Sequence, residues 1–280
     1  MAATQENPRG QVVGETFAEY VARRGINASA LKAARISLLH YSHYLRCPRV
    51  ETAAMALGTA VHCLALEPGR FDSRYCVCRC NGNTTKGKEE REEARLSGHR
   101  VISENDYDHA RRMADAVRSH PLAAEYLRDG AAEQTIAWTD EETGVECKGR
   151  VDWIGAAVVD LKTTRDIGAR RFASQMWDLG LHIQAAMYLD GCEAVSGERR
   201  PFVCIAVEKS APHDVGVWHL SEPMVEMGRT EYRYLIRRVL DAAKSERWPG
   251  RYESEQEMVA PAWSGFDDGP GIDFGGEVIE

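Results

Sequence analysis

Residues 149–162 read GRVDWIGAAVVDLK. Two strand-forming segments lie on either side of Gly155, so the stretch predicts a β-hairpin. Asp160 and Lys162 are two residues apart, so both side chains leave the second strand by the same face. Asp160 also follows an apolar run, 156–159, which is typical of a buried strand that ends at solvent or at a site. Carboxylates beside a lysine suit hydrolysis with a divalent metal, whereas a surface ion pair at a strand end is the alternative.

The elements expected around this hairpin predict an α/β domain in which a central mixed β-sheet is flanked by helices. Helices are expected over 28–44, 52–66, 105–120, 169–191 and 222–245, and strands over 71–80, 134–139, 145–154, 157–163, 202–207 and 215–220. We expect one domain over residues 30–250. A lead-in over 1–29 precedes it, and an acidic, Gly-rich tail over 251–280 follows it.

Composition is that of a soluble globular protein, with 280 residues, 44% hydrophobic and 28% charged. No secretory signal and no membrane-spanning window is visible, and the eight Cys do not follow a disulfide framework, so a reduced, cytoplasmic protein is expected. The net charge of −8 argues against nucleic-acid binding, but residues 246–280 hold nine acids against two basic residues. The rest of the chain is therefore nearly neutral and can hold a basic groove.

Polar residues outside the hairpin have both structural and functional interpretations. Gln184 and Tyr188 are four apart and share a helix face, either as site residues or as the polar stripe of a half-exposed helix. His62 lies in an apolar helix, where a hydrogen-bonded core histidine is the usual alternative to a ligand. Glu133 precedes a strand and can be a solvated turn acid.

Taken in order along the chain, these residues resemble the motifs of the PD-(D/E)xK nuclease superfamily. The matching positions are His62, Asp152, Asp160-Leu161-Lys162, Gln184 and Tyr188. The flanking text over residues 30–250 is similar to the RecE type, the nuclease domain of exodeoxyribonuclease VIII and its prophage relatives. One departure is Val151, which stands where the family often has proline.

The resemblance implies a restriction-endonuclease-like core and a Mg²⁺-dependent exonuclease, with Mn²⁺ able to substitute. It implies 5′→3′ action on linear double-stranded DNA, which yields single-stranded DNA for phage-type recombination. The implied metal ligands are His62, Asp152, Asp160 and the carbonyl of Leu161. The implied catalytic residues are Asp152, Asp160, Lys162, Gln184 and Tyr188.

The implied partners are double-stranded DNA ends and a single-strand annealing protein, and relatives of this kind form homo-oligomeric rings. The same resemblance implies a phage or prophage protein of the bacterial cytoplasm without a membrane partner. An endonuclease, a Cas4-like end-processing nuclease and a non-cleaving DNA-binding protein that retains the fold are the alternatives.

Three other groups have weaker patterns. Cys76, Cys78 and Cys80 alternate along an expected strand, unlike the turn spacings of zinc or iron–sulfur sites, so we interpret them as structural thiols. Residues 81–99 are polar and predict a mobile loop. Its basic residues alternate with Glu, as in a solvated helix or a DNA-tracking arm, and the next helix offers other phosphate contacts. These two basic sets are Lys86, Lys88, Arg91 and Arg95, and Arg111, Arg112 and Arg118.

Overall fold

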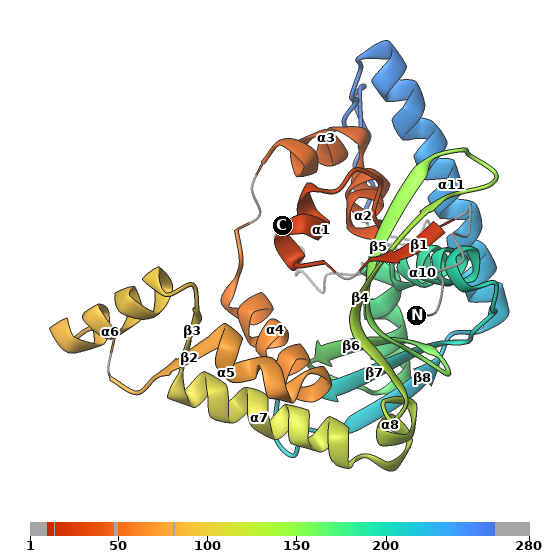
Figure 1. The fold of residues 1–280 in the computed structure, drawn as a ribbon. Helices are drawn as coiled ribbons and strands as arrows, with labels where there is room; N and C mark the ends of the chain where they lie inside the picture. The colour runs from red at the N-terminus through yellow and green to blue at the C-terminus, as the bar shows by residue number, and fades with distance from the viewer. Residues whose placement is uncertain (1–9, 14, 48–49, 81, 261–280) are drawn as a thin grey trace, which may run out of the picture.

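A six-stranded mixed sheet forms the centre of the computed structural model, which describes residues 10–13, 15–47, 50–80 and 82–260 (Figure 1). The spatial order is β1-β4-β5-β6-β7-β8, and β6 and β7 are the parallel pair among antiparallel neighbours. The strands are β1 (Gly10–Val13), β4 (Gly130–Thr139), β5 (Glu146–Gly155), β6 (Val158–Thr164), β7 (Phe202–Glu208) and β8 (Val215–His219). Helices cover both faces, which confirms the predicted fold class.

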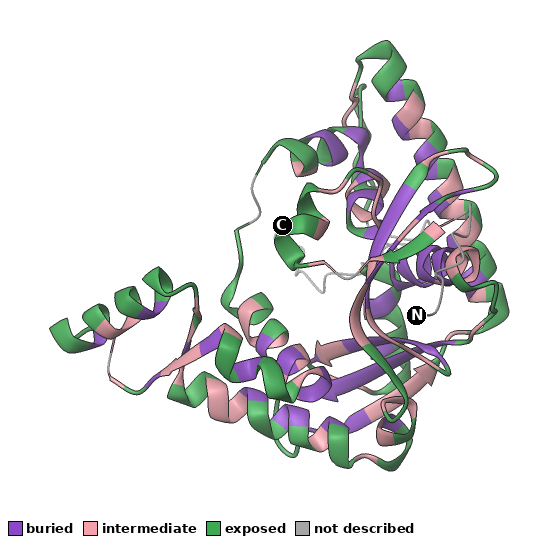
Figure 2. Cartoon of the chain, in the orientation of Figure 1, coloured by how far each residue is buried: buried purple, intermediate pink, exposed green. Residues whose placement is uncertain are grey.

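One helical layer packs on the face of the sheet that includes Ile136, Val151 and Val158. Its members are α2 (Ala28–Ile36), α3 (Leu38–Arg46), α9 (Ala169–Asp178), α10 (Leu181–Ser196) and α11 (Glu222–Ser245). Every residue from Leu181 to Tyr188 is buried, so α10 is a core helix (Figure 2). In the part of the chain that the structure describes, no helix combines the length and apolar character needed to cross a membrane.

Two of the expected helices are each divided in two. Ser37 is extended, and its hydroxyl accepts a hydrogen bond from His40 N–H, so it ends α2 and caps α3. Gly180 has a φ of +66°, which ends α9 and begins α10 with a change of direction. The prediction of helical structure over 28–44 and 169–191 is therefore confirmed, but the prediction of one continuous helix in each range is wrong.

The second layer packs on the opposite face, against Val159, Leu161 and Val203. It contains α4 (Ala53–Leu66), a 3₁₀ turn (Pro68–Arg70), α5 (Phe71–Arg74), α7 (Glu104–Ser119) and α8 (Pro121–Tyr126). The Thr52 hydroxyl accepts from Met55 N–H and starts α4 at the predicted place.

An arm projects from this layer (Figure 1). It consists of β2 (Tyr75–Cys78), α6 (Thr85–Leu96) and β3 (Arg100–Ser103), with β2 and β3 parallel. The predicted strand over 71–80 is thus wrong in its first half, which is α5, and the predicted loop over 81–99 contains α6. Thr84 caps α6 by accepting from Gly87 N–H, and most of the helix is exposed, as the solvated-helix interpretation expects (Figure 2).

The chain before α2 also differs from its prediction. Residues expected in a loose lead-in form β1 at the sheet edge and α1 (Phe17–Ala22). A four-residue strand and a six-residue helix are too short to produce a hydrophobic period. As described below, α1 lies beside the candidate site.

Candidate active site

Two strands separate at the centre of the sheet, and the separation creates room for a site. β5 and β6 pair at only two positions, Trp153 with Val159 and Ile154 with Val158. Beyond them, the N–H of Leu161 donates to Asp152 Oδ2 at 2.8 Å instead of to a strand neighbour. The N–H and C=O of one strand residue point to the same side, so the Leu161 carbonyl also faces this gap.

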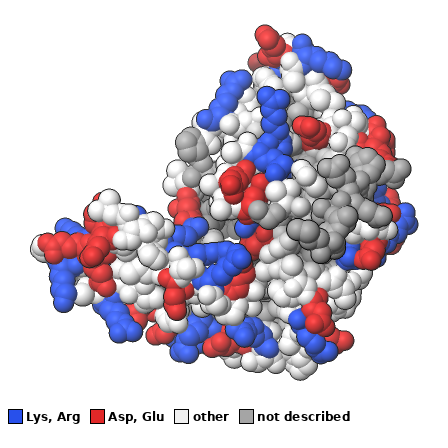
Figure 3. Space-filling model, viewed as in Figure 1, with Lys and Arg blue, Asp and Glu red and all other residues white. Residues whose placement is uncertain are grey.

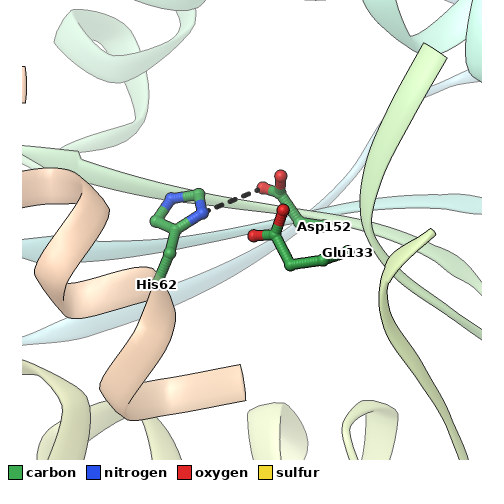
Figure 4. A group of neighbouring side chains, drawn as sticks. All are labelled: His62, Glu133 and Asp152. Carbon is green, nitrogen blue, oxygen red and sulfur yellow. Dashed lines mark ion pairs between the residues drawn. The ribbon is translucent and has the colours of Figure 1, made fainter. Parts of the chain in front are cut away.

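Three side chains from three elements meet beside the gap (Figure 4). His62 comes from α4, Glu133 from β4 and Asp152 from β5, and their ligand atoms all lie within 4.8 Å of one another. His62 Nδ1 is 3.6 Å from Asp152 Oδ2. His62 is only partly buried, so the core-histidine alternative is wrong. The solvated-acid interpretation of Glu133 is also wrong, because Glu133 belongs to this cluster.

Strand register explains why Glu133 reaches Asp152. Ala132 pairs with Trp153 and Gln134 with Val151, so Glu133 and Asp152 are opposite each other. Glu133 has a φ of 52°, a left-handed conformation that is uncommon for a residue with a side chain and that clusters at functional sites. Because β4 and β5 follow each other in the chain, their antiparallel pairing, and with it the position of Glu133 opposite Asp152, could have been proposed from the sequence. The backbone conformation of Glu133 had no sequence signal.

This cluster fits a divalent cation. The two carboxylates and the nearby Leu161 carbonyl are oxygen donors, which Mg²⁺ and Mn²⁺ prefer, and the imidazole adds a nitrogen donor that suits a transition metal such as Mn²⁺ better than Mg²⁺. Arg150 Nε donates to Glu133 Oε2 at 2.8 Å and holds one of the carboxylates in place. A candidate divalent-metal site is therefore present, built from His62, Glu133 and Asp152.

Asp160 lies in a separate set of contacts. Its carboxylate is completely buried, and Lys162 Nζ lies 2.7 Å from Oδ1 and 2.6 Å from Oδ2. Gln184 Nε2 donates to Oδ1 at 2.6 Å. The structure thus joins Asp160, Lys162 and Gln184 as predicted, and the role of Asp160 as a metal ligand stays a prediction.

A fourth residue, Lys32 of α2, extends this set. Its Nζ donates to Gln184 Oε1 at 2.6 Å. A lysine can only donate and an ionised carboxylate can only accept, so Gln184 must turn its oxygen to Lys32 and its amide nitrogen to Asp160. Lys32 therefore fixes the amide orientation of Gln184. No motif pointed to Lys32, because it is 152 residues from Gln184 in the sequence.

The pKa values of the two central groups follow from burial and from their mutual charges. Burial raises the pKa of Asp152 to about 6, with His62 opposing the shift and the Asp160 charge adding to it. Burial alone would lower the pKa of Lys162, but Asp160 and Asp152 together raise it above its usual value. Lys162 is therefore a protonated cation at neutral pH and suits charge stabilisation better than proton abstraction.

Tyr188 fixes the β5 backbone. Its hydroxyl donates to the Arg150 carbonyl at 2.8 Å, and burial raises its pKa well above the usual value. Its ring lies on Gly149, where a Cβ would come 2.9 Å from Tyr188 Cε1. Gln184 and Tyr188 are both buried, so the half-exposed-stripe interpretation is wrong. Tyr188 thus acts on the strand that carries Asp152.

A cleft of about 1530 Å³ leads to His62, Glu133 and Asp152. Its walls are α1, α3 and α4 with the strands β4 and β5, and Figure 3 views this face of the molecule. Eight basic residues line it against five acidic ones. The basic residues are Arg23, Arg24, Arg46, Arg70, Arg74, Arg100, Lys148 and Arg150. The cleft is therefore basic in a chain whose net charge is −8.

The phosphate-contact residues expected on α7 lie elsewhere. Arg111 pairs with Asp108, and Arg112 Nε donates to the Asp108 carbonyl. Arg111, Arg112 and Arg118 are not among the residues that line the cleft, so their role as phosphate contacts stays a prediction. The arginines of the cleft come from segments without a charge pattern, and folding alone brings them together.

Residues 28–258 match the family described as PDDEXK-like domain of unknown function (DUF3799). The chain belongs to this family. A solved structure from Eubacterium rectale, described as a "putative exonuclease", is similar to the PDDEXK-like domain with a TM-score of 0.61 and 16% sequence identity. The similarity covers 93% of this chain and 96% of that one, and it supports the fold. No curated protein sequence matches the chain significantly.

Proposed function

We propose that this chain is a divalent-metal-dependent deoxyribonuclease. One observation carries the proposal. A cluster of His62, Glu133 and Asp152 lies at a basic cleft, beside the buried Asp160 and its partly exposed partner Lys162. The basic lining suits a polyanion, and membership in a PDDEXK-like family agrees with this chemistry.

Different residues would have different roles in phosphodiester hydrolysis. His62, Glu133 and Asp152 would hold the cation, which would polarise the phosphate and make bound water more acidic. Lys162, kept protonated by Asp160, stabilises the negative charge that develops on the phosphate. Gln184 keeps Asp160 oriented toward Lys162.

We further propose an exonuclease that degrades linear double-stranded DNA, 5′→3′, with Mg²⁺ or Mn²⁺. The description of the Eubacterium rectale protein and the similarity of the motifs to the RecE type support this choice. The product would be single-stranded DNA for phage-type recombination, used with a single-strand annealing protein. A ring of subunits would surround DNA with several basic clefts. Light scattering of the purified chain tests the ring, and a monomer would contradict it.

End-labelled linear duplex and relaxed circular duplex test the activity, each with Mg²⁺, with Mn²⁺ and with EDTA. We expect digestion of the linear DNA only, with no reaction in EDTA. Early release of a 5′ label supports the 5′→3′ direction. Cutting of the circle would instead favour the endonuclease. DNA binding without cleavage in either metal would contradict the proposal and leave a non-cleaving DNA-binding protein.

Replacing Lys32 with methionine is expected to lower kcat about tenfold with little change in KM, because Gln184 loses the partner that fixes its amide. Lys32→Arg, which keeps a donor, should recover most of the rate. Lys244→Met on α11 removes an exposed lysine and is the control. Equal kcat values for Lys32→Met and the control would exclude a positioning role for Lys32.

A further inference from the structure

Exposed apolar side chains line the cleft beside the arginines. Phe17 and Val21 of α1 are 62% and 60% exposed, and Leu45 of α3 and Met55 of α4 are 60% and 46% exposed. All four lie in the cleft lining, on walls that come from different parts of the chain. Isolated apolar residues on a surface need no explanation, but four in one basic cleft indicate a ligand with apolar faces.

Phe17 is connected to the candidate site through Arg150. The Arg150 guanidinium lies over the Phe17 ring at 5.9 Å, and Arg150 in turn donates to Glu133. Phe17 is thus two contacts away from a residue of the proposed metal cluster. A group stacked on this ring would lie in the cleft that leads to His62, Glu133 and Asp152.

Two cationic side chains of β5, Lys148 and Arg150, hold α1 at this place by hydrogen bonds to backbone carbonyls. The Lys148 ammonium is buried and donates to the carbonyls of Tyr20, Val21 and Arg23 at the carboxyl end of α1. The Arg150 guanidinium donates to the carbonyl of Glu15 at the other end. Both cations come from β5, the strand that carries Asp152, so α1 and the site share one support.

The cleft also offers cations for phosphates. Arg24 and Arg46 are exposed in its lining, and neither has an ion pair with another residue of the described ranges. Most of the other basic residues there are paired with acids, for example Arg23 with Glu15 and Arg100 with Glu51. Arg24 and Arg46 are therefore the guanidinium groups most accessible to an incoming anion.

A cleft that combines exposed apolar side chains with unpaired arginines suits single-stranded DNA better than duplex DNA. A duplex presents phosphates, sugars and base edges to a protein, while its base faces stay stacked inside. An unpaired strand exposes its base faces, and aromatic side chains stack on them with little sequence preference. The cleft lining therefore matches an unpaired strand in both charge and apolar character.

We propose that the cleft binds a single strand of DNA, with a base stacked on Phe17 next to the scissile phosphate. This inference rests on the proposed function, which supplies DNA as the polymer. A duplex end would have to separate before one strand reaches His62, Glu133 and Asp152.

Binding is best measured in the full chain carrying Asp152→Asn, which stops cleavage. Fluorescence anisotropy compares a short oligo(dT) strand with a blunt hairpin duplex of the same length. We expect at least a tenfold preference for oligo(dT). Adding Phe17→Ala should weaken oligo(dT) binding about tenfold, and Phe17→Trp should retain it. A preference for the duplex, or unchanged oligo(dT) binding in Phe17→Ala, would overturn the proposal, as would absence of oligo(dT) binding.

Tyr234→Ala is the matched control. Tyr234 on α11 is 54% exposed and has the Arg238 guanidinium 5.8 Å from its ring, yet it is not in the cleft lining. Its replacement should leave oligo(dT) binding unchanged. The two proposals fail separately. Phe17-dependent binding without cleavage by the unmodified chain rejects only the nuclease, whereas cleavage with Phe17-independent binding rejects only the single-strand subsite.

Discussion

Asp160→Asn is expected to lower the rate of DNA cleavage by roughly a thousandfold or more. The substitution keeps the shape of the side chain but removes the charge that holds Lys162 protonated. Without it, the pKa of Lys162 falls, because burial then dominates, and the lysine becomes a weaker stabiliser of the phosphate charge. Single-turnover cleavage of end-labelled linear duplex measures the loss.

DNA binding should survive in Asp160→Asn, because Asp160 is completely buried and is not in the cleft lining. Asp115→Asn, an exposed aspartate on α7, is the matched control and should cleave normally. Retained cleavage by folded Asp160→Asn protein would contradict the proposed mechanism. A cooperative thermal unfolding transition for the variant excludes loss of fold as the cause.

Divalent-cation binding is expected to weaken steeply as the pH falls through about 6, the pKa to which burial raises Asp152. The protonated carboxyl cannot hold a cation, so metal and proton compete for it. The increase in Tm that Mn²⁺ causes measures the competition. We expect a clear increase at pH 7.5 and almost none at pH 5. An increase that does not depend on pH would show that Asp152 does not bind the metal.

The raised pKa of Asp152 also sets the stability of the metal-free protein. Its folded-state value, about 6, exceeds the ordinary 3.8, so this contribution to stability is complete below pH 4 and is lost as the pH rises through 6. The ionised group costs on the order of 3 kcal/mol at pH 7. Asp152→Asn should therefore raise the Tm without metal by several degrees and abolish the Mn²⁺ effect, whereas Asp115→Asn should change neither.

The sequence predicts the sheet and much of the site because their signals are local. The apolar run before Asp160 identifies β6, and the 24-residue α11 covers the predicted range 222–245. His62, Asp152, Lys162 and Gln184 come to the centre of the molecule as the motif order implies. These residues lie on helices and strands that are long enough, or regular enough in their apolar pattern, to be recognised from the sequence.

The missed features depend on strand register, on local backbone conformation or on contacts between distant segments. Glu133 joins the cluster through strand register and a left-handed backbone, and Lys32 meets Gln184 across the core. α1 lies at the cleft because Lys148 binds its carbonyls, although its six residues carry no period. Such contacts have no local sequence signal, so only the folded structure reveals them.

The separation of β5 from β6 has a consequence for judging relatives of this protein. The site depends on a defect in the ladder, because the Leu161 amide is free to bind Asp152 only where strand pairing stops. A relative whose two strands pair for another few residues would occupy that amide and carbonyl in the sheet. It could keep every acidic residue and the lysine and still be a pseudoenzyme. The extent of pairing between β5 and β6 is therefore a criterion for catalytic activity in a relative, and the sequence motif alone does not reveal it.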